Sequence, residues 1–262
     1  DIQIYYAMKA NPMPAVVQHL ATLVDGIDVA SAGELRIALD TTIPPNQISF
    51  AGPGKRDNEL SCAIASGIII NMESEQEMKR ISILGKRLGI RPKVAIRVNP
   101  DFELRSSGMK MSGEGKQFGI DAERVPPILA QMNTLELDFK GFHIFCGSQN
   151  LSAKAIQETQ EQVLELFLHL AKKAPDPICL FNIGGGFGVP YFPGENSLDI
   201  KLSYSYIFSK SNLLLQSIID LCIFGYIIFW LLYGIDSTIL LFILVLVLLV
   251  LLVLLVLLVL LV

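Results

Sequence analysis

Short apolar runs alternate with amphipathic stretches through residues 1–200, and this alternation limits the possible folds more than any other feature of the chain. Seven runs have the length and the residue types of buried strands: 3–8, 26–30, 47–51, 67–72, 93–98, 139–145 and 178–183. The stretches between them have helical spacing of their apolar residues: 13–24, 32–40, 56–66, 74–88, 121–132 and 152–173. Strict alternation of strands and helices predicts a parallel sheet.

The number and length of these units favour a barrel. About seven βα units of roughly 25 to 40 residues predict an incomplete TIM-type (β/α)8 barrel, because a complete barrel has eight units in about 250 residues. An open, doubly wound sheet is the competing architecture. No GxGxxG segment follows the first predicted strand, which argues against dinucleotide binding by such a sheet.

Residues 201–262 differ in composition from the rest. They carry only Lys201, Lys210, Asp220 and Asp236 as charges and end in a tract of leucine and valine. We therefore predict two domains, a partial barrel over 1–200 and a hydrophobic helical tail over 201–262. As a helix, the uncharged residues 239–262 are long enough to span a bilayer of about 30 Å. Alternatively, the Leu-Leu-Val period is a translation artefact of a repeated or disrupted gene.

Charge and cysteine usage exclude several classes of function. A net charge of −4 with mixed signs gives no nucleic-acid-binding surface. The four cysteines form no CxxC pair and the three histidines have no metal-ligand spacing, so we expect neither disulfides nor a bound metal. This usage suits a cytoplasmic barrel, which would be membrane-associated if the tail is genuine. Asp1 is not an initiator methionine and opens almost directly onto a strand, so we expect the true N-terminus to be missing.

Polar residues follow the predicted strands, at the end where TIM barrels place their active sites. Lys9 comes at the end of the apolar run 4–8 and just before Asn11-Pro12. That pattern predicts a buried strand with a lysine at its tip. Because burial disfavours the charged amine, such a lysine has a lowered pKa and can attack a carbonyl, as a Schiff-base lysine must. The alternative is an ordinary solvated lysine.

Gly184-Gly185-Gly186 follows the seventh predicted strand. Three glycines let backbone N–H groups close on a phosphate without obstruction by side chains. Ser148 offers a hydroxyl donor after the sixth strand. The alternative is a tight connection without a ligand. Together with Lys9, this pattern indicates a phosphate-bearing aldehyde cofactor, pyridoxal phosphate (PLP).

Four ordered motifs within about residues 1–200 resemble the fold-type III PLP-dependent decarboxylases, which include the diaminopimelate, ornithine and arginine decarboxylases. They are Tyr6-Ala7-Met8-Lys9-Ala10-Asn11, Asp28-Val29-Ala30-Ser31-Ala32-Gly33-Glu34-Leu35, Gly147-Ser148-Gln149 and Asn182-Ile183-Gly184-Gly185-Gly186-Phe187-Gly188. Three more segments look like the exosortase A system-associated branch of that family: 107–111, 141–145 and 189–195.

The resemblance implies an amino-acid decarboxylase that acts as a homodimer. Lys9 would form the internal aldimine, and Gly184, Gly185 and Gly186, with Ser148, would hold the phosphate. Asp28 and Arg97 match polar positions near the cofactor ring and its imine. For Arg97 the alternative is a structural pair with an acidic neighbour at the barrel mouth.

His143 and Phe145 depart from the pattern of the diaminopimelate decarboxylases. In that pattern a histidine that stacks on the cofactor ring stands three residues before the serine of Gly-Ser-Gln, and here Phe145 holds this position. A phenyl ring can stack but offers neither a cation nor a proton. His143 lies on the same strand face by parity, where it either assists at the cofactor or serves as a core histidine.

Two further expectations follow from what the resemblance lacks. No Glu-Pro-Gly-Arg segment is present, which in the family supplies the carboxylate for the pyridine nitrogen. The family's C-terminal β-domain is also not found. We therefore expect this chain to be inactive as written. An alternative function is a PLP carrier or an alanine-racemase-like barrel without decarboxylase activity.

Overall fold

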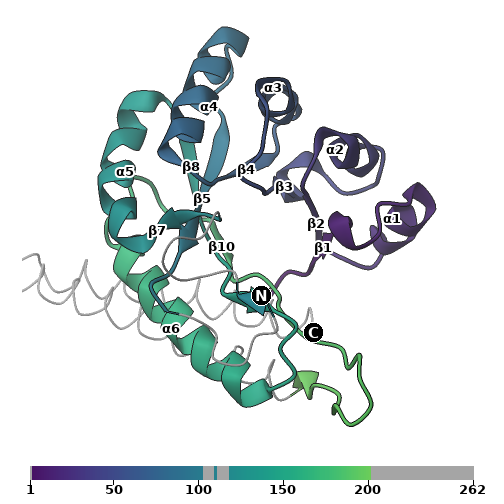
Figure 1. Cartoon of the computed structure of the whole chain (residues 1–262). Coiled ribbons are helices and arrows are strands. Elements are labelled where there is room, and N and C mark those ends of the chain that lie inside the picture. Colours follow the sequence, from purple (N-terminus) through teal and green to yellow (C-terminus); the bar gives the residue numbers. More distant parts are fainter. Residues whose placement is uncertain (1, 103–108, 111–117, 202–262) are drawn as a thin grey trace, which may run out of the picture. The chain divides into compact units, whose positions relative to one another are not determined.

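The computed structural model describes residues 2–102, 109–110 and 118–201 (Figure 1). The chain divides into two units, Asp1–Tyr204 and Ser205–Val262. The second unit lies outside the described residues, as does the predicted membrane helix over 239–262. Most of the loop 101–118 also lies outside them. Among the helices of the described residues, none is both long and apolar enough to cross a membrane.

The first unit contains a curled parallel sheet whose main strands follow one another in chain order. The strands are β1 (Tyr5–Ala7), β2 (Gly26–Val29), β3 (Ile48–Phe50), β4 (Ile69–Met72), β5 (Lys93–Asn99), β8 (Asp138–Ile144) and β10 (Leu180–Asn182). A short strand, β7 (Ile120–Asp121), also pairs with β5 in parallel. A separate antiparallel pair joins β6 (Met109–Lys110) to β9 (Gly147–Ser148).

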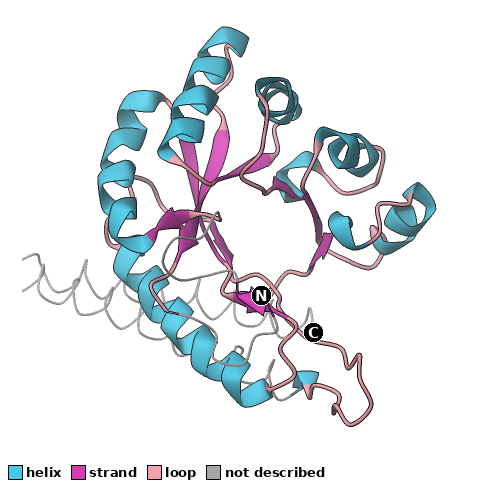
Figure 2. Ribbon diagram, viewed as in Figure 1, coloured by secondary structure: helices cyan, strands magenta, loops and turns pink. Residues whose placement is uncertain are grey.

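Helices lie on the outside of the curled sheet, and the strands line its inside (Figure 2). The α-helices are α1 (Pro14–Leu20), α2 (Ala32–Leu39), α3 (Asp57–Ser66), α4 (Glu75–Leu88), α5 (Val125–Met132) and α6 (Ala153–Ala171). Short 3-10 turns occur at η1 (Met8–Ala10), η2 (Pro45–Gln47), η3 (Ala122–Arg124) and η4 (Asn133–Leu135). The incomplete TIM-type barrel is therefore confirmed, and the doubly wound alternative is wrong, since that fold has helices on both faces of its sheet.

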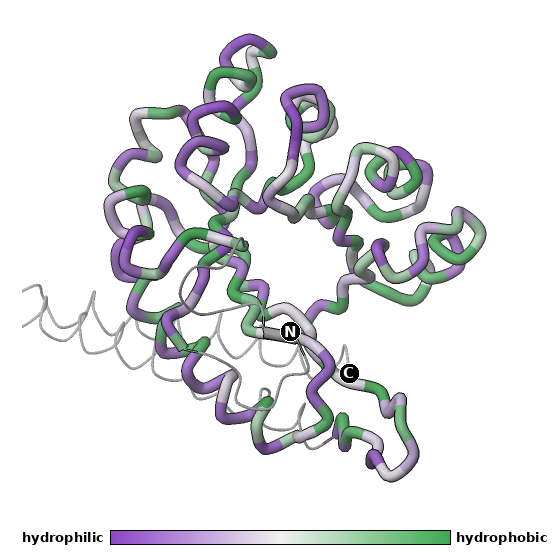
Figure 3. Tube along the Cα trace, in the orientation of Figure 1, coloured by the Kyte–Doolittle hydropathy of each residue, from purple (hydrophilic) through white to green (hydrophobic). Residues whose placement is uncertain are grey.

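Local sequence signals fix where the helices begin and end. The hydroxyls of Ser31, Ser74 and Ser152 accept backbone N–H groups in the first turns of α2, α4 and α6. Gly67 and Gly89 end α3 and α4 in the left-handed conformation, with φ of 71° and 65°. Hydrophilic and hydrophobic residues alternate along the outer helices, as expected for helices with one buried face (Figure 3).

The core lies between the outer face of the sheet and the helices. Around β8 it is aromatic: Phe142 packs edge-on to Phe139 at 5.2 Å and to Phe167 of α6 at 6.1 Å between ring centroids. Phe167 in turn stacks on Phe181 of β10 at 3.9 Å. These rings attach α6 and the last strand to the rest of the sheet.

Replacing Phe142 by alanine should lower the free energy of unfolding by about 3–5 kcal/mol, because it leaves a cavity between β8 and α6. Urea unfolding followed by circular dichroism measures this. Ile83→Ala is the control, because Ile83 on α4 is 51% exposed, and we expect a change within about 0.5 kcal/mol. Equal losses in the two variants would contradict the packing described here.

Candidate active site

Alternation along the strands separates core residues from residues that face the barrel interior. Ile96 and Val98 of β5 belong to the core beneath the helices, so Arg97 between them faces the interior. Likewise, Phe142 and Ile144 are core residues and His143 faces inward. The sheet register sets His143 of β8 between Arg97 of β5 and Asn182 of β10. Two of the predicted site residues, Arg97 and His143, are thus neighbours.

Lys9 lies in η1, directly after β1, and it is exposed. The predicted burial of this lysine is therefore wrong. The physical reason is that β1 is only three residues long and, among the described strands, pairs with β2 alone, so the described residues leave the turn that follows it exposed. The charge of Lys9 still acts on the interior, where it opposes the rise in the pKa of Asp28 and contributes to the fall in the pKa of His143.

Asp28 of β2 accepts a hydrogen bond from the hydroxyl of Ser49 on β3. Burial raises the pKa of this carboxyl to about 6, although the positive charges of Lys9 and Arg97 oppose the shift. Burial, reinforced by the nearby carboxylates of Asp28 and Asp25, raises the pKa of Tyr5 to about 12. Asp28 therefore stands beside neutral polar groups and within the field of two cations.

Arg97 pairs with Glu73, which follows β4 directly. Arg97 Nη1 donates to Glu73 Oε1 at 2.9 Å, and both side chains are buried. The guanidinium also lies over the ring of Phe118, at 4.8 Å from its centroid. The structural pair that the sequence left open for Arg97 is thus present, while its proposed role at a cofactor stays a prediction.

A second buried pair supports the first. Lys55 Nζ donates to Glu77 Oε1 at 2.9 Å, to the carbonyl of Asn71 at 2.8 Å and to that of Gly52 at 2.7 Å. Burial lowers the pKa of Lys55 and raises that of Glu77, and the attraction between the two charges opposes both shifts. The predicted set of site residues omits this pair and Glu73. Their sequence signal is that charged residues stand a few positions after two short, mainly apolar strands.

His143 is buried, and within the described part of the chain its Nδ1 has no hydrogen-bond partner. Burial lowers its pKa to about 3, and Arg97, Lys9 and Lys55 act in the same direction. The imidazole is therefore neutral at pH 7. Since Phe145 is also uncharged, neither ring supplies a cation to the site.

The glycine turn closes tightly on the segment that follows β8. Gly184 and Gly186 have φ of 67° and 84°. A Cβ at Gly184 would lie 2.3 Å from the Phe145 ring, and one at Gly186 would lie 2.3 Å from the carbonyl oxygen of Gly147. Only glycine fits at either position. Backbone bonds of Asn150 to Gly186 (3.0 Å) and of Gly188 to Asn150 (2.8 Å) hold the two segments together.

The same turn fits a phosphate. The N–H of Gly184 donates to Asn182 Oδ1 at 2.7 Å. In the described part of the chain, no hydrogen bond uses the N–H groups of Gly185 and Gly186. Because Gly185 is exposed, an anion can approach its N–H group. Ser148 lies in β9, within the segment that Gly186 contacts, so the structure brings Ser148 close to the glycine turn.

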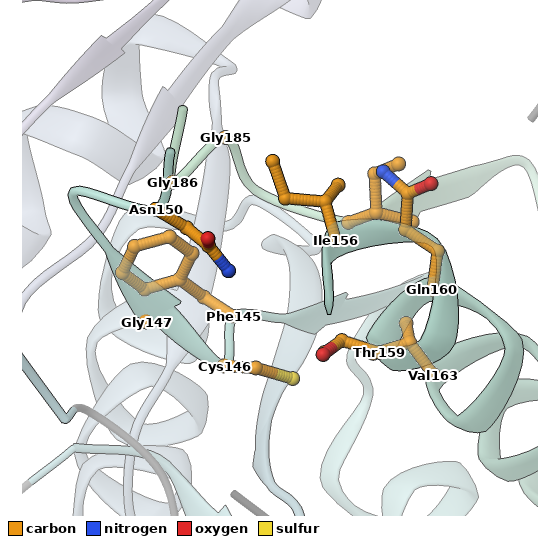
Figure 4. A pocket seen from close by; sticks show the side chains of 11 residues that line it. Phe145, Cys146, Gly147, Asn150, Ile156, Thr159, Gln160, Val163, Gly185 and Gly186 are labelled. Carbon is orange, nitrogen blue, oxygen red and sulfur yellow. The ribbon is translucent and has the colours of Figure 1, made fainter. Parts of the chain in front are cut away.

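A small cavity of about 30 Å³ lies between this turn and α6 (Figure 4). Its lining includes Phe145, Cys146 and Gly186 on one side and Thr159 and Gln160 of α6 on the other. This volume holds one or two water molecules and is too small for a cofactor. A cofactor that uses the turn would therefore lie on the barrel side of it.

Three comparisons with known proteins agree with this geometry. The family model described as "Pyridoxal-dependent decarboxylase, pyridoxal binding domain" matches residues 1–220. The L-glutamyl-[BtrI acyl-carrier protein] decarboxylase of Niallia circulans is 38% identical over 205 residues, 76% of this chain and 47% of that protein. The diaminopimelate decarboxylase of Aquifex aeolicus is 38% identical over 198 residues, 74% of this chain and 47% of that protein.

Among solved structures, diaminopimelate decarboxylase from Helicobacter pylori complexed with L-lysine superposes with a TM-score of 0.71 at 27% identity. The superposition covers 79% of this chain and 53% of that one. The chain thus spans about half the length of the relatives that it matches.

Asp28→Asn should stabilise the fold at pH 7. Folding raises the pKa of Asp28 from 3.8 to about 6, so this carboxyl favours the folded state below pH 3.8, and that contribution is lost as the pH rises through 6. A shift of about two units corresponds to about 3 kcal/mol. Because the side chain is only partly buried, we expect a gain of about 1–2 kcal/mol.

Urea unfolding at pH 7 and at pH 4 measures this gain. It should be present at pH 7 and nearly absent at pH 4, where the native carboxyl is already protonated. The exposed Asp40 at the end of α2 provides the control Asp40→Asn, for which we expect a change below about 0.5 kcal/mol. A gain of the same size at both pH values would show that burial of the Asp28 charge is not its cause.

Proposed function

The chain belongs to the family of pyridoxal-dependent decarboxylases, and from this premise we propose that residues 1–200 form the cofactor-binding barrel of an amino-acid decarboxylase. The cofactor of this family is pyridoxal phosphate. The observation that carries the proposal is that a lysine and a glycine turn follow strands at the end of the barrel near which three polar side chains of the strands, Asp28, Arg97 and His143, also lie. We also propose that residues 201–262 form a separate domain.

Each of these residues has a distinct proposed task. Lys9 would hold the aldehyde carbon of the cofactor, and its position outside the core leaves the amine accessible. Gly185 and Gly186, assisted by Gly184 and Ser148, would bind the phosphate. When bound, the cofactor accepts the electron pair that remains as an amino acid loses CO₂.

Three inward side chains would surround the ring. Arg97 supplies a positive charge that attracts the carboxylate or phosphate of a ligand. His143 supplies a neutral ring, which adds no further positive charge beside Arg97. Asp28, whose pKa of about 6 lies near neutrality, can hold or release a proton beside the amine of Lys9.

The proposed substrate is an α-amino acid, free or as a conjugate. The names of two relatives support this class, since one acts on diaminopimelate and the other on a glutamyl group on an acyl-carrier protein. We further propose that the whole protein is a homodimer in the cytoplasm. Because the chain spans about half of these relatives, its 262 residues alone would bind the cofactor and catalyse little or no decarboxylation.

Borohydride reduction of the PLP-treated chain, followed by peptide mapping, should place a pyridoxyl group on Lys9. Lys9→Met should abolish the label. Lys55 serves as an internal control, because its ammonium is buried and already makes three hydrogen bonds. A label on any other lysine would contradict the assignment of Lys9.

Release of ¹⁴CO₂ from carboxyl-labelled amino acids tests the second part of the proposal. We expect the purified 262-residue chain to release no more CO₂ than its Lys9→Met variant. A full-length homologue with the same motifs should release CO₂ from at least one amino acid of a panel that includes diaminopimelate and glutamate. Racemisation without CO₂ in that homologue would favour the racemase-like alternative, and CO₂ from the 262-residue chain would refute its inactivity.

A further inference from the structure

Glu73 connects three segments at the mouth of the barrel. Its Oε1 accepts from Arg97 Nη1 at 2.9 Å and from the N–H of Gly52 at 2.6 Å. Its Oε2 accepts from the N–H of Gly119 at 3.1 Å. One buried carboxylate thus ties the loop after β3 and the approach to β7 to the guanidinium on β5.

The backbone of Glu73 is fixed as well. Its N–H donates to Glu77 Oε2 at 2.7 Å, and the other oxygen of Glu77 is held by Lys55. The Lys55 ammonium also donates hydrogen bonds to the backbone carbonyls of Gly52 and Asn71. Because backbone and side chain are both held, Glu73 has little freedom to follow Arg97, and Arg97 must instead adapt to Glu73.

The Arg97 guanidinium bonds the carboxylate of Glu73, and its charge also acts on a second carboxyl, that of Asp28. No hydrogen bond among the described residues joins Arg97 to Asp28, however, whose hydrogen bond comes from Ser49. A buried guanidinium without a partner is strongly disfavoured. If Glu73 were lost, Asp28 would be a carboxylate on which the charge of Arg97 already acts.

We propose that Glu73 is a positioning residue that holds Arg97 away from Asp28 and so keeps both side chains available to a ligand in the barrel. The inference rests on the proposed function for its purpose, because the ligand would be the cofactor with its amino-acid substrate. The positioning itself is a property of the chain without cofactor. It can therefore be measured when no PLP is present.

The titration of Asp28 reports on this positioning. Among the described residues, Lys9, Arg97 and Tyr5 are the ionisable groups that interact with Asp28, and Ser49 is its hydrogen-bond donor. If Arg97 moves to Asp28, the pKa of that carboxyl falls from about 6 by about 1 unit or more. A general loosening of the fold would also lower this pKa, because it would expose Asp28, but that fall would not depend on Arg97 and would persist when Arg97 is replaced.

The experiment is carbon-detected NMR titration of the full chain labelled at the aspartate carboxyl carbons, with Asp28→Asn to assign the signal. We expect Glu73→Gln to lower the pKa of Asp28 by about 1 unit or more. Glu75→Gln is the matched control, because Glu75 pairs with Arg124 at 2.6 Å on the surface two residues away. It should leave Asp28 unchanged.

A double-mutant cycle separates movement of Arg97 from loss of the Glu73 charge. In an Arg97→Gln background, Glu73→Gln should no longer lower the pKa of Asp28. A shift that persists there would show that Glu73 acts directly through its charge or that the fold has loosened, and the proposal would be overturned.

Glu73→Asp keeps the test decisive if Glu73→Gln does not fold. The shorter carboxylate keeps its charge but reaches Arg97 less well, so we expect a smaller fall in the Asp28 pKa. No fall in either variant would also overturn the proposal. Failure of pyridoxyl labelling at Lys9, by contrast, would contradict the proposed function and leave this result unaffected.

Discussion

A chain of four buried charges, Lys55–Glu77–Glu73–Arg97, holds the mouth of the barrel together. Isolated buried charges are costly, and they persist only when they are paired and hydrogen-bonded. Here each carboxylate also accepts backbone N–H groups, and Lys55 donates to two carbonyls. Gly52 after β3, Glu73 after β4 and Gly119 before β7 cannot move independently without breaking one of these bonds.

The signs of these charges set the electrostatics of the interior. The chain has two cations and two anions, yet the charge of Arg97, together with that of Lys9, still opposes the rise in the pKa of Asp28. Burial keeps His143 neutral at pH 7, which avoids a third positive charge beside Arg97. The interior thus combines a fixed guanidinium with a carboxyl that titrates near neutrality, an arrangement typical of sites that bind anions and move protons.

The sequence predicts the architecture well because one rule governs it. Alternating apolar runs and amphipathic stretches determine a parallel sheet, and strand parity then places Arg97 and His143 side by side on its inner face. Sequence reasoning fails where the outcome depends on contacts between distant segments. Lys9 is exposed because β1 is short and is paired with only one described strand, and neither property can be read from its own residues. The pairing of Lys55 with Glu77 depends equally on how α4 meets the loop after β3.

The glycine turn shows how packing and binding can require the same residues. From sequence, Gly184-Gly185-Gly186 indicates a phosphate site or a bare tight connection. In the structure, Gly184 is required by the ring of Phe145 and Gly186 by the carbonyl of Gly147. Packing thus accounts for both outer glycines before any ligand is considered. The middle glycine meets no such contact, since the nearest atom to its Cβ position is 4.0 Å away. Packing therefore leaves room for a side chain at Gly185. The presence of glycine at this position is better explained by access of an anion to the backbone N–H.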